Sequence, residues 1–389
     1  MNILLLDLFG SFLTEDMQYC IKKLGHNCKS VQFILADKEG NDEFSSFMKK
    51  ELSEGSFDIV LTTNYYPAVA RICYVNNIVY CAWVYDSPPE IQSLETLDYS
   101  TNRIFFFCRY DYESYKNQGF DNVYYLPLGA NIERLSSFKA IDKYQCDVSL
   151  VGGLYHSDSF LGLKSIMAPE QQQFLEAMVQ VQLKHAGSMV LDSALTEDFV
   201  EQVCRHYKDQ SEMAVQPNKA QLFYSICAHI THMERLALLR LSAGNGYSTR
   251  LYASSVTDQN RDLLTSQGVE IHGPVNYGRE MPQVFLSSKI NLNPTLRANR
   301  TGIPLRVVDV LGVGGFLLTT HQAELDDFFF EDEIATYECV EEAIEKIDYY
   351  LSHESERVLL AAKGHERAKK DFSFEDRIKA IMYIATKSR

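Results

Sequence analysis

The segment Lys289–Thr320 holds the residues whose types and spacing are best suited to chemistry. Its arginines Arg297, Arg300 and Arg306 lie close together in a chain whose formal charge is −15. Gly302 and a nearby proline precede a run that is typical of a helix, since proline fits a first turn, where an N–H has no partner. A helix start with basic side chains beside it predicts a site for an anion such as a diphosphate.

Asp309 follows Arg306 by three residues, so the two side chains lie on neighbouring parts of one face of the expected helix. A carboxylate at this place could accept hydrogen bonds from both hydroxyls of a ribose. The same spacing is also typical of a structural ion pair, and the residues alone leave both interpretations open.

A second group of candidates ends two apolar runs in the first third of the chain. Asp86 follows the run that contains Trp83, and two nearby prolines hold the chain in a rigid turn. Its carboxylate could act as a general base on an acceptor hydroxyl, could bind the acceptor, or could cap the turn. Asn64 and Tyr65 end the preceding run. With Trp83 they are candidates for the acceptor side, although such aromatic residues are more often part of a core.

Histidines and cysteines give weaker signals. His229 and His232 lie three residues apart on an expected helix, but no further ligand has suitable spacing, so no metal site is predicted. The nine cysteines form no CxxC pair and most lie in apolar runs, which indicates reduced thiols and a cytoplasmic protein. No signature of a covalent hydrolase occurs, nor does a Walker A loop.

Apolar runs of strand length alternate with helix-like segments in two successive parts of the chain. In the first part the runs cover residues 3–8, 31–35, 57–61, 78–84, 104–107 and 123–126. The alternation predicts two Rossmann-like domains with parallel sheets, each binding ligands at the carboxyl ends of its strands. The first loop lacks the GxGxxG fingerprint of dinucleotide sites.

Residues 131–146 are polar and without strong periodicity, so we place the domain boundary there. The predicted domains are residues 1–140, on the acceptor side, and residues 141–371, with a helical insert from about residue 169 to 241. The acidic charge disfavours nucleic acid and anionic membranes as partners, and no apolar run is long enough for an integral membrane segment. The first residues fit a strand better than a signal peptide.

Longer segments carry a family resemblance. SKINLNPTLRANRTGIPLRVVDVLGVGGFLLTTHQAELDDFF resembles the donor-site region of the CgeB-like (spore maturation protein CgeB) glycosyltransferases. FDIVLTTNYYP, CAWVYDSPPEI and NVYYLPLGAN resemble the accompanying N-terminal domain, and CDVSLVGGLY fits the start of the second. The resemblance implies a GT-B fold, with two facing Rossmann-like domains, a hinge near residues 131–146, and a last helix, 372–389, that packs back on the first domain.

The resemblance also implies site residues. Asp309 matches the acidic residue that holds the nucleotide ribose, and His272 ends the strand that runs beside the base. Thr301 departs from the wider retaining superfamily, which has an acidic residue there. The residues implied to bind the donor nucleotide are Asp309, Arg306, Arg297, Lys289, Gly152, Gly153, Gly302 and His272.

We therefore expect a metal-independent glycosyltransferase without a cofactor. It would move a sugar from a nucleotide-diphosphate sugar donor to a hydroxyl of an acceptor, which is a protein, a glycan or a small molecule. Two alternatives stay open. One is a GT-B-type epimerase. The other, kept open by Thr301, is a non-catalytic protein that binds a nucleotide-sugar or a partner in spore or envelope assembly.

Overall fold

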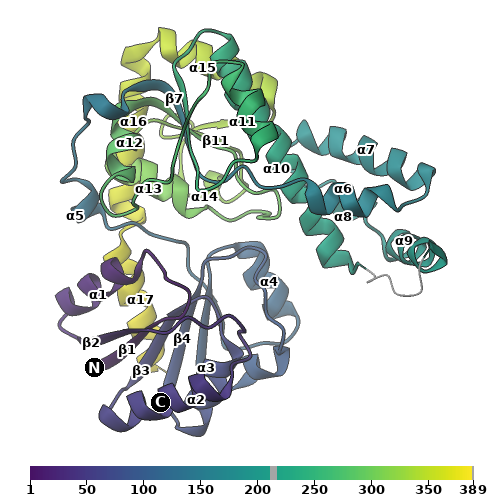
Figure 1. Ribbon diagram of the computed structural model, residues 1–389. Helices are drawn as coiled ribbons and strands as arrows, with labels where there is room; N and C mark the ends of the chain where they lie inside the picture. The colour runs from purple at the N-terminus through teal and green to yellow at the C-terminus, as the bar shows by residue number, and fades with distance from the viewer. Residues whose placement is uncertain (211–216, 388–389) are drawn as a thin grey trace. The chain divides into compact units, whose positions relative to one another are not determined.

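Two compact units make up the part of the chain that the computed structural model describes, residues 1–210 and 217–387 (Figure 1). The first unit contains residues 1–135, 301–312 and 368–389, and the second contains residues 136–300 and 313–367. Each unit is built around one six-stranded parallel sheet, which confirms the expected fold class of two Rossmann-like domains. Residues 301–312, predicted as part of the C-terminal domain, group with the first unit.

The sheet of the first unit has the strand order β2-β1-β3-β4-β5-β6. Its strands are β1 (Asn2–Asp7), β2 (Asn27–Gln32), β3 (Ile59–Thr63), β4 (Val79–Val84), β5 (Asn102–Phe106) and β6 (Val123–Tyr125). Its helices are α1 (Thr14–Lys23), α2 (Asp42–Glu54), α3 (Pro67–Val75), α4 (Arg109–Asn117), α5 (Ile132–Leu135) and α17 (Phe374–Lys387), with short 3-10 turns such as η1 (Leu94–Asp98). Because β2 and β3 lie on opposite sides of β1, the strand order reverses between β1 and β3.

Local sequence signals explain these elements. The six residues of β4 are all buried, as expected for a strand of a parallel sheet that helices cover on both faces. Helix α2 begins after Asn41, whose side chain accepts a hydrogen bond from the backbone N–H of Phe44 at 2.8 Å. Phe44 and Met48 lie one turn apart and are both buried against the core of this sheet.

The sheet of the second unit has the order β12-β11-β10-β7-β8-β9. Its strands are β7 (Cys146–Val151), β8 (Thr249–Tyr252), β9 (Glu270–His272), β10 (Ser288–Asn293), β11 (Leu317–Thr320) and β12 (Ala335–Tyr337). Its further elements are η2 (Asp142–Tyr144), α11 (Asp258–Thr265), α12 (Met281–Ser287), α13 (Leu305–Val313, mostly in the first unit), α14 (Leu325–Phe328), α15 (Val340–Ser352) and α16 (Glu354–Asp371). The strand order reverses between β7 and β10, because β8 and β9 follow on one side and β11 and β12 on the other.

A helical insert separates β7 from β8, as the sequence predicts. It contains α6 (Asp158–Ser165), α7 (Pro169–Leu183), α8 (Leu191–Ala194), α9 (Glu197–Gln210) and the long α10 (Lys219–Gly244). The insert has a core of its own, in which Leu175 of α7, Val203 of α9 and Ile226 of α10 are fully buried. In Figure 1, α7 and α9 extend away from the second sheet, while the later turns of α10 lie beside it. Among the described residues, no helix has both the length and the apolar character needed to cross a membrane.

Candidate active site

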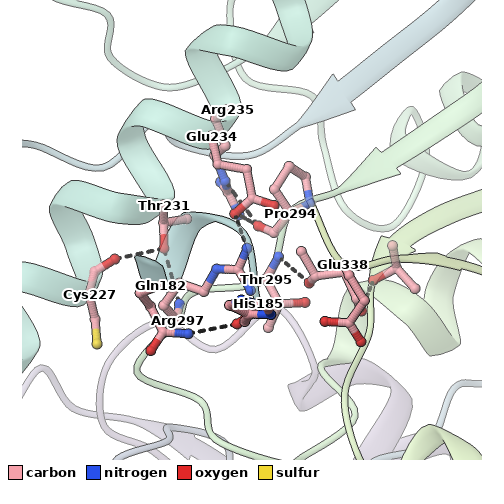
Figure 2. Close-up of polar contacts among 12 residues, drawn as sticks. Gln182, His185, Cys227, Thr231, Glu234, Arg235, Pro294, Thr295, Arg297 and Glu338 are labelled. Carbon is pink, nitrogen blue, oxygen red and sulfur yellow. Dashed lines mark hydrogen bonds and ion pairs between the residues drawn. The ribbon is translucent and has the colours of Figure 1, made fainter. Parts of the chain in front are cut away.

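The switch point of the second sheet lies between the carboxyl ends of β7 and β10, where open α/β sheets bind their ligands. One side chain from α10 spans it. Arg235 donates from Nη1 to the carbonyl oxygen of Gly153, which follows β7, and from Nε (3.1 Å) and Nη2 (2.6 Å) to that of Pro294, which follows β10. Figure 2 shows Arg235 reaching Pro294 from α10. The guanidinium therefore ties together the two loops that border the switch point.

Two adjacent glycines at the end of β7 have different roles. Gly152 has a φ of +150°, which side chains disfavour, and a Cβ there would lie 3.3 Å from Nη1 of Arg235. Gly153 is exposed, and a Cβ there would meet no heavy atom within 4 Å. The first glycine is thus required by the backbone and by Arg235, whereas the second leaves open space at the switch point.

Small polar side chains fix the loop that leaves β10. Asn293 donates from Nδ2 to the hydroxyls of Thr295 (3.1 Å) and Thr319 (2.9 Å). The backbone N–H of Thr295 donates to the hydroxyl of Thr320 at 3.0 Å, at the end of the neighbouring β11. All four residues are buried, so the start of this loop is held by satisfied hydrogen bonds.

Arg297 lies further along the same loop, where it is 2% exposed. Its Nη2 forms an ion pair at 3.0 Å with Glu234 of α10, which is 1% exposed. Its backbone N–H donates to the hydroxyl of Thr231 at 3.0 Å, as Figure 2 shows. Burial, together with the charge of Glu234, raises the pKa of the neighbouring Tyr337 well above its usual range. Because the guanidinium of Arg297 is buried and paired with Glu234, the structure favours a role for Arg297 in shaping the loop rather than in contacting a diphosphate directly.

Two other residues predicted to bind the donor lie at opposite ends of the strands of the same sheet. His272 ends β9 at the carboxyl edge, where it is exposed and stacks on Tyr252 of β8 with ring centroids 5.0 Å apart. Lys289 lies near the amino end of β10 and pairs with Asp147 at 2.8 Å. The structure therefore does not bring Lys289 together with the residues at the switch point.

The remaining donor candidates belong to the segment that groups with the first unit. Arg306 and Asp309, on the first turns of α13, form an ion pair at 3.6 Å, and Asp309 is buried. Gly302, in the loop before α13, is also buried. The hydroxyl of Thr301 lies 3.3 Å from Sγ of Cys108 and accepts a hydrogen bond from the backbone N–H of Tyr110 at 3.3 Å. Thr301 thus interacts with the start of α4 within the first unit.

Polar side chains lie at the carboxyl ends of β1, β3 and β4 in the first sheet. Asp7, at the end of β1, is 7% exposed and accepts backbone hydrogen bonds from Gly10 and Ser11, both at 2.7 Å. Asn64 has a φ of +63°, and its Nδ2 donates to Asp86 at 2.8 Å while its Oδ1 accepts from the backbone N–H of Tyr85 at 2.8 Å. Asn64 thereby holds the loop after β4 and the carboxylate of Asp86 in place.

The electrostatics of Asp86 suit a proton acceptor. Desolvation raises the pKa of its carboxyl above the usual value, while Lys38 and the hydrogen bond from Asn64 lower it in part. The side chain still reaches solvent. A carboxylate with a raised pKa and an exposed oxygen is suited to accept a proton from a hydroxyl.

The aromatic candidates on the acceptor side are core residues in this structure. Trp83 is fully buried, and its indole N–H donates to the carbonyl oxygen of Leu126 at 3.3 Å. Tyr65 is 2% exposed and donates its hydroxyl hydrogen to Thr96 at 2.8 Å. Their burial favours the structural interpretation that their sequence pattern left open, because neither ring presents a face to solvent for stacking on a sugar.

Comparison with known proteins gives the fold a name. Residues 232–383, less than half of the chain, match a family model described as "Glycosyl transferase-like". The structure is similar over 99% of the chain to sucrose-phosphate synthase from Thermosynechococcus elongatus, with a TM-score of 0.60, 8% identity and 98% of that protein covered. The chain has the GT-B glycosyltransferase fold.

Other GT-B structures are comparably similar. A glycosyltransferase from Rickettsia africae aligns over 100% of this chain and 98% of its own, with a TM-score of 0.60 and 10% identity. HepE from Anabaena, in complex with UDP and glucose, aligns over 99% of both chains, with a TM-score of 0.57 and 10% identity. No curated protein matches the sequence. The finer resemblance to CgeB-like enzymes stays a prediction.

The described residues also bear on metal binding and on thiol chemistry in this GT-B chain. Within residues 1–210 and 217–387, no group of three or more His, Cys, Asp or Glu residues is arranged to hold a metal ion. All nine cysteines are free, and burial raises the pKa of several of them, to about 12 for Cys20 and Cys81. Thiols with raised pKa values are poor nucleophiles at neutral pH.

Proposed function

We propose that the protein is a glycosyltransferase that moves a sugar from a nucleoside diphosphate sugar to an acceptor hydroxyl, without a metal ion. The observation that carries the proposal is the bridge from Arg235 to Gly153 and Pro294 across the switch point. That bridge lies in the unit that contains most of the segment matching the glycosyl transferase-like model. A glycine that leaves open space at the switch point lets the backbone approach a bound diphosphate closely.

Each candidate residue then has a proposed role. Gly153 leaves room for the donor, and Arg235 fixes the loops that border it. Asp309 binds the ribose and Arg306 neutralises the diphosphate, as the family resemblance implies. Asp86 is the base that takes the proton of the acceptor hydroxyl. The rate enhancement would come mainly from holding the reactants together and from stabilising the charge of the departing diphosphate.

The donor is best sought among UDP-sugars first, because HepE was crystallised with UDP and glucose and has the same fold. A panel of UDP-, GDP- and ADP-sugars would be tested by thermal shift for binding and by release of free nucleotide for turnover. The proposal expects turnover with at least one donor once an acceptor alcohol is supplied, and no loss of turnover on adding EDTA. Binding without turnover would favour the non-catalytic alternative.

Gly153→Leu tests the site itself. Because a side chain at this position meets open space, the variant should fold normally yet weaken UDP binding by about tenfold or more, which is about 1.4 kcal/mol. Gly244→Leu, at the end of α10, adds the same side chain at an equally open glycine and should change neither property. Unchanged UDP binding by Gly153→Leu would contradict a donor site at the switch point. Unchanged binding by Asp309→Ala would remove only the proposed role of Asp309.

A further inference from the structure

A second candidate binding site lies in the helical insert of the second unit. A cavity of about 930 Å³ opens between α6, α7, α10 and α11. None of the residues at the switch point, Gly153, Arg235 and Pro294, lines it. Its volume is within the range of sites that hold small molecules.

Helix α10 forms a wall between this cavity and the carboxyl edge of the sheet. His229, His232 and Leu236 recur at intervals of three and four residues and line the cavity. Glu234 and Arg235 lie on another side of the helix and contact the loop after β10. The two faces of one helix thus serve two separate sites.

Two of the three histidines in the cavity, His229 and His232, have defined hydrogen bonds. Nδ1 of His232 lies 3.2 Å from the carbonyl oxygen of Leu154, which can only accept, so Nδ1 carries the hydrogen and Nε2 is an acceptor. Nδ1 of His229 pairs with the hydroxyl of Ser157 at 2.8 Å, and its ring stacks on Phe160 at 4.3 Å. Burial lowers the pKa of both histidines, to about 4 for His229, so both are uncharged at neutral pH.

The rest of the lining combines apolar side chains with polar groups that carry little net charge. Lys164 is paired with Glu176, and amide side chains, which both donate and accept hydrogen bonds, come from α7 and α11. The only other formal charge in the lining is Asp158, on the first turn of α6. The apolar side chains of the lining include Phe160, Leu161, Met233, Leu236 and Leu263. The amide residues of the lining are Gln173, Gln180, Gln259 and Asn260.

We propose that this cavity binds an uncharged, polyhydroxylated ligand such as a monosaccharide or disaccharide, at a site separate from the switch point. Hydroxyl groups donate to Nε2 of His232 and exchange hydrogen bonds with the amides, and the C–H faces of the sugar contact the leucines. An anion would meet Asp158 and Glu176, and an apolar ligand would form no hydrogen bond with Nε2 of His232. The proposal does not depend on sugar transfer at the switch point.

Saturation-transfer NMR with glucose, N-acetylglucosamine, maltose and sucrose tests the proposal, with titration calorimetry for any sugar that binds. Ala177 is exposed on α7 and lines the cavity, so Ala177→Trp should obstruct it without disturbing the core. We expect at least one sugar to bind, and Ala177→Trp and His232→Phe each to weaken that binding by about tenfold, as for the loss of a good hydrogen bond. Val181→Trp, one turn further along α7 and outside the cavity, should leave sugar binding unchanged.

UDP binding serves as the independent readout. It should be the same in wild-type protein, Ala177→Trp and Val181→Trp, so failure of the cavity proposal is distinguishable from failure of the proposed function. If His232→Phe does not fold, as judged by its melting curve, Ala177→Trp decides alone. Absence of binding by all four sugars would overturn the proposal, as would sugar binding that Ala177→Trp leaves intact. Binding of an apolar dye that Ala177→Trp abolishes, without any sugar binding, would assign the cavity to an apolar ligand instead.

Discussion

At the carboxyl edge of the first sheet two carboxylates and an amide lie at the strand ends, whereas at the switch point of the second sheet a guanidinium joins the strand ends. Asp7 is the last residue of β1, Asn64 follows β3, and Asp86 lies two residues after β4. Arg235 joins the loops after β7 and β10 in the second sheet. The first sheet reverses its order after two strands, between β1 and β3, and the second after three, between β7 and β10, so the two sheets also differ in topology.

The difference concerns what each edge can bind. Carboxylates repel a diphosphate but accept hydrogen bonds and protons from hydroxyl groups. In the second sheet Arg235 fixes two loops, and the exposed Gly153 between them lets the backbone approach an anion closely. We therefore expect the donor diphosphate at the loops of the second sheet and the acceptor hydroxyl at Asp86 in the first, and the predictions that follow test these roles and the side chains that support them.

The largest effect is expected at Asp86. Asp86→Asn should lower kcat by about 10²- to 10⁴-fold, the usual contribution of a general base. Glu90→Gln removes a nearby exposed carboxylate that pairs with Lys38 at 3.4 Å and should cost little activity. Equal losses in the two variants would show that Asp86 acts only through the local charge.

The pH dependence of Asp86 gives a second readout. A base works only when deprotonated, and desolvation raises this pKa, so kcat should fall on the acid side with an apparent pKa above 3.8. A raised pKa also means that the folded protein disfavours the carboxylate. The contribution of this group to the free energy of unfolding therefore declines as pH rises from the unfolded pKa through the folded one. Asp86→Asn should accordingly lose no stability at neutral pH, as measured by urea denaturation.

The next largest effect is on the free energy of unfolding and concerns the buried ion pair of Glu234 and Arg297 in the second unit. Glu234→Gln leaves Arg297 charged and buried, which should lower the free energy of unfolding by about 3–5 kcal/mol. The first unit offers a matched pair, Asp16 and Arg134, joined at 2.8 Å, but there the arginine side chain is 24% exposed. Asp16→Asn should cost less, because water can reach that guanidinium. Glu234→Gln combined with Arg297→Met should recover much of the loss. An undiminished loss in the double variant would mean that the charge pair is not the cause.

A smaller effect compares two glycines. Gly152 and Gly10 both have positive φ, +150° and +78°, and lie at the switch points of the second and first sheets. Alanine at either position should lower stability by about 1–3 kcal/mol through backbone strain. Only Gly152→Ala should also weaken UDP binding, since its Cβ would lie 3.3 Å from Arg235. Weakened UDP binding by Gly10→Ala would instead place the donor at the first sheet.

How far the sequence predicts this molecule depends on whether a signal is local. The buried runs of β4 and β10 and the helix after Pro304 follow from composition and spacing, and the structure has them. The apolar run 31–35 predicts a strand, but the strand that pairs with β1 is Asn27–Gln32. An edge strand needs one apolar face at most, so a continuous apolar run is a poor guide to its position. The short edge strand β12 contains no apolar run long enough to predict a strand.

The candidate site depends more on contacts between distant residues. Arg235 lies in the middle of a helical run, and its bonds to Gly153 and Pro294 join residues 82 and 59 positions away, which no local pattern records. The burial of Arg297 likewise depends on its ion pair with Glu234, which lies on another element, α10. Adjacent glycines and a proline at the start of a helix can be recognised from neighbouring residues in the sequence. The partner of a charged side chain cannot, because it lies on a distant segment.

The smallest effect is expected at His272, on the outer strand of the carboxyl edge. If the nucleobase lies beside this ring, His272→Ala should weaken UDP binding by about fivefold, or about 1 kcal/mol, as for the loss of one stacking contact. Stability should hardly change, because the side chain is exposed. His353 provides the control, since it stacks on Tyr349 with ring centroids 4.1 Å apart at the end of α15. Equal UDP binding by His272→Ala and His353→Ala would restrict the donor site to the loops that Arg235 joins, and the base would then be held elsewhere.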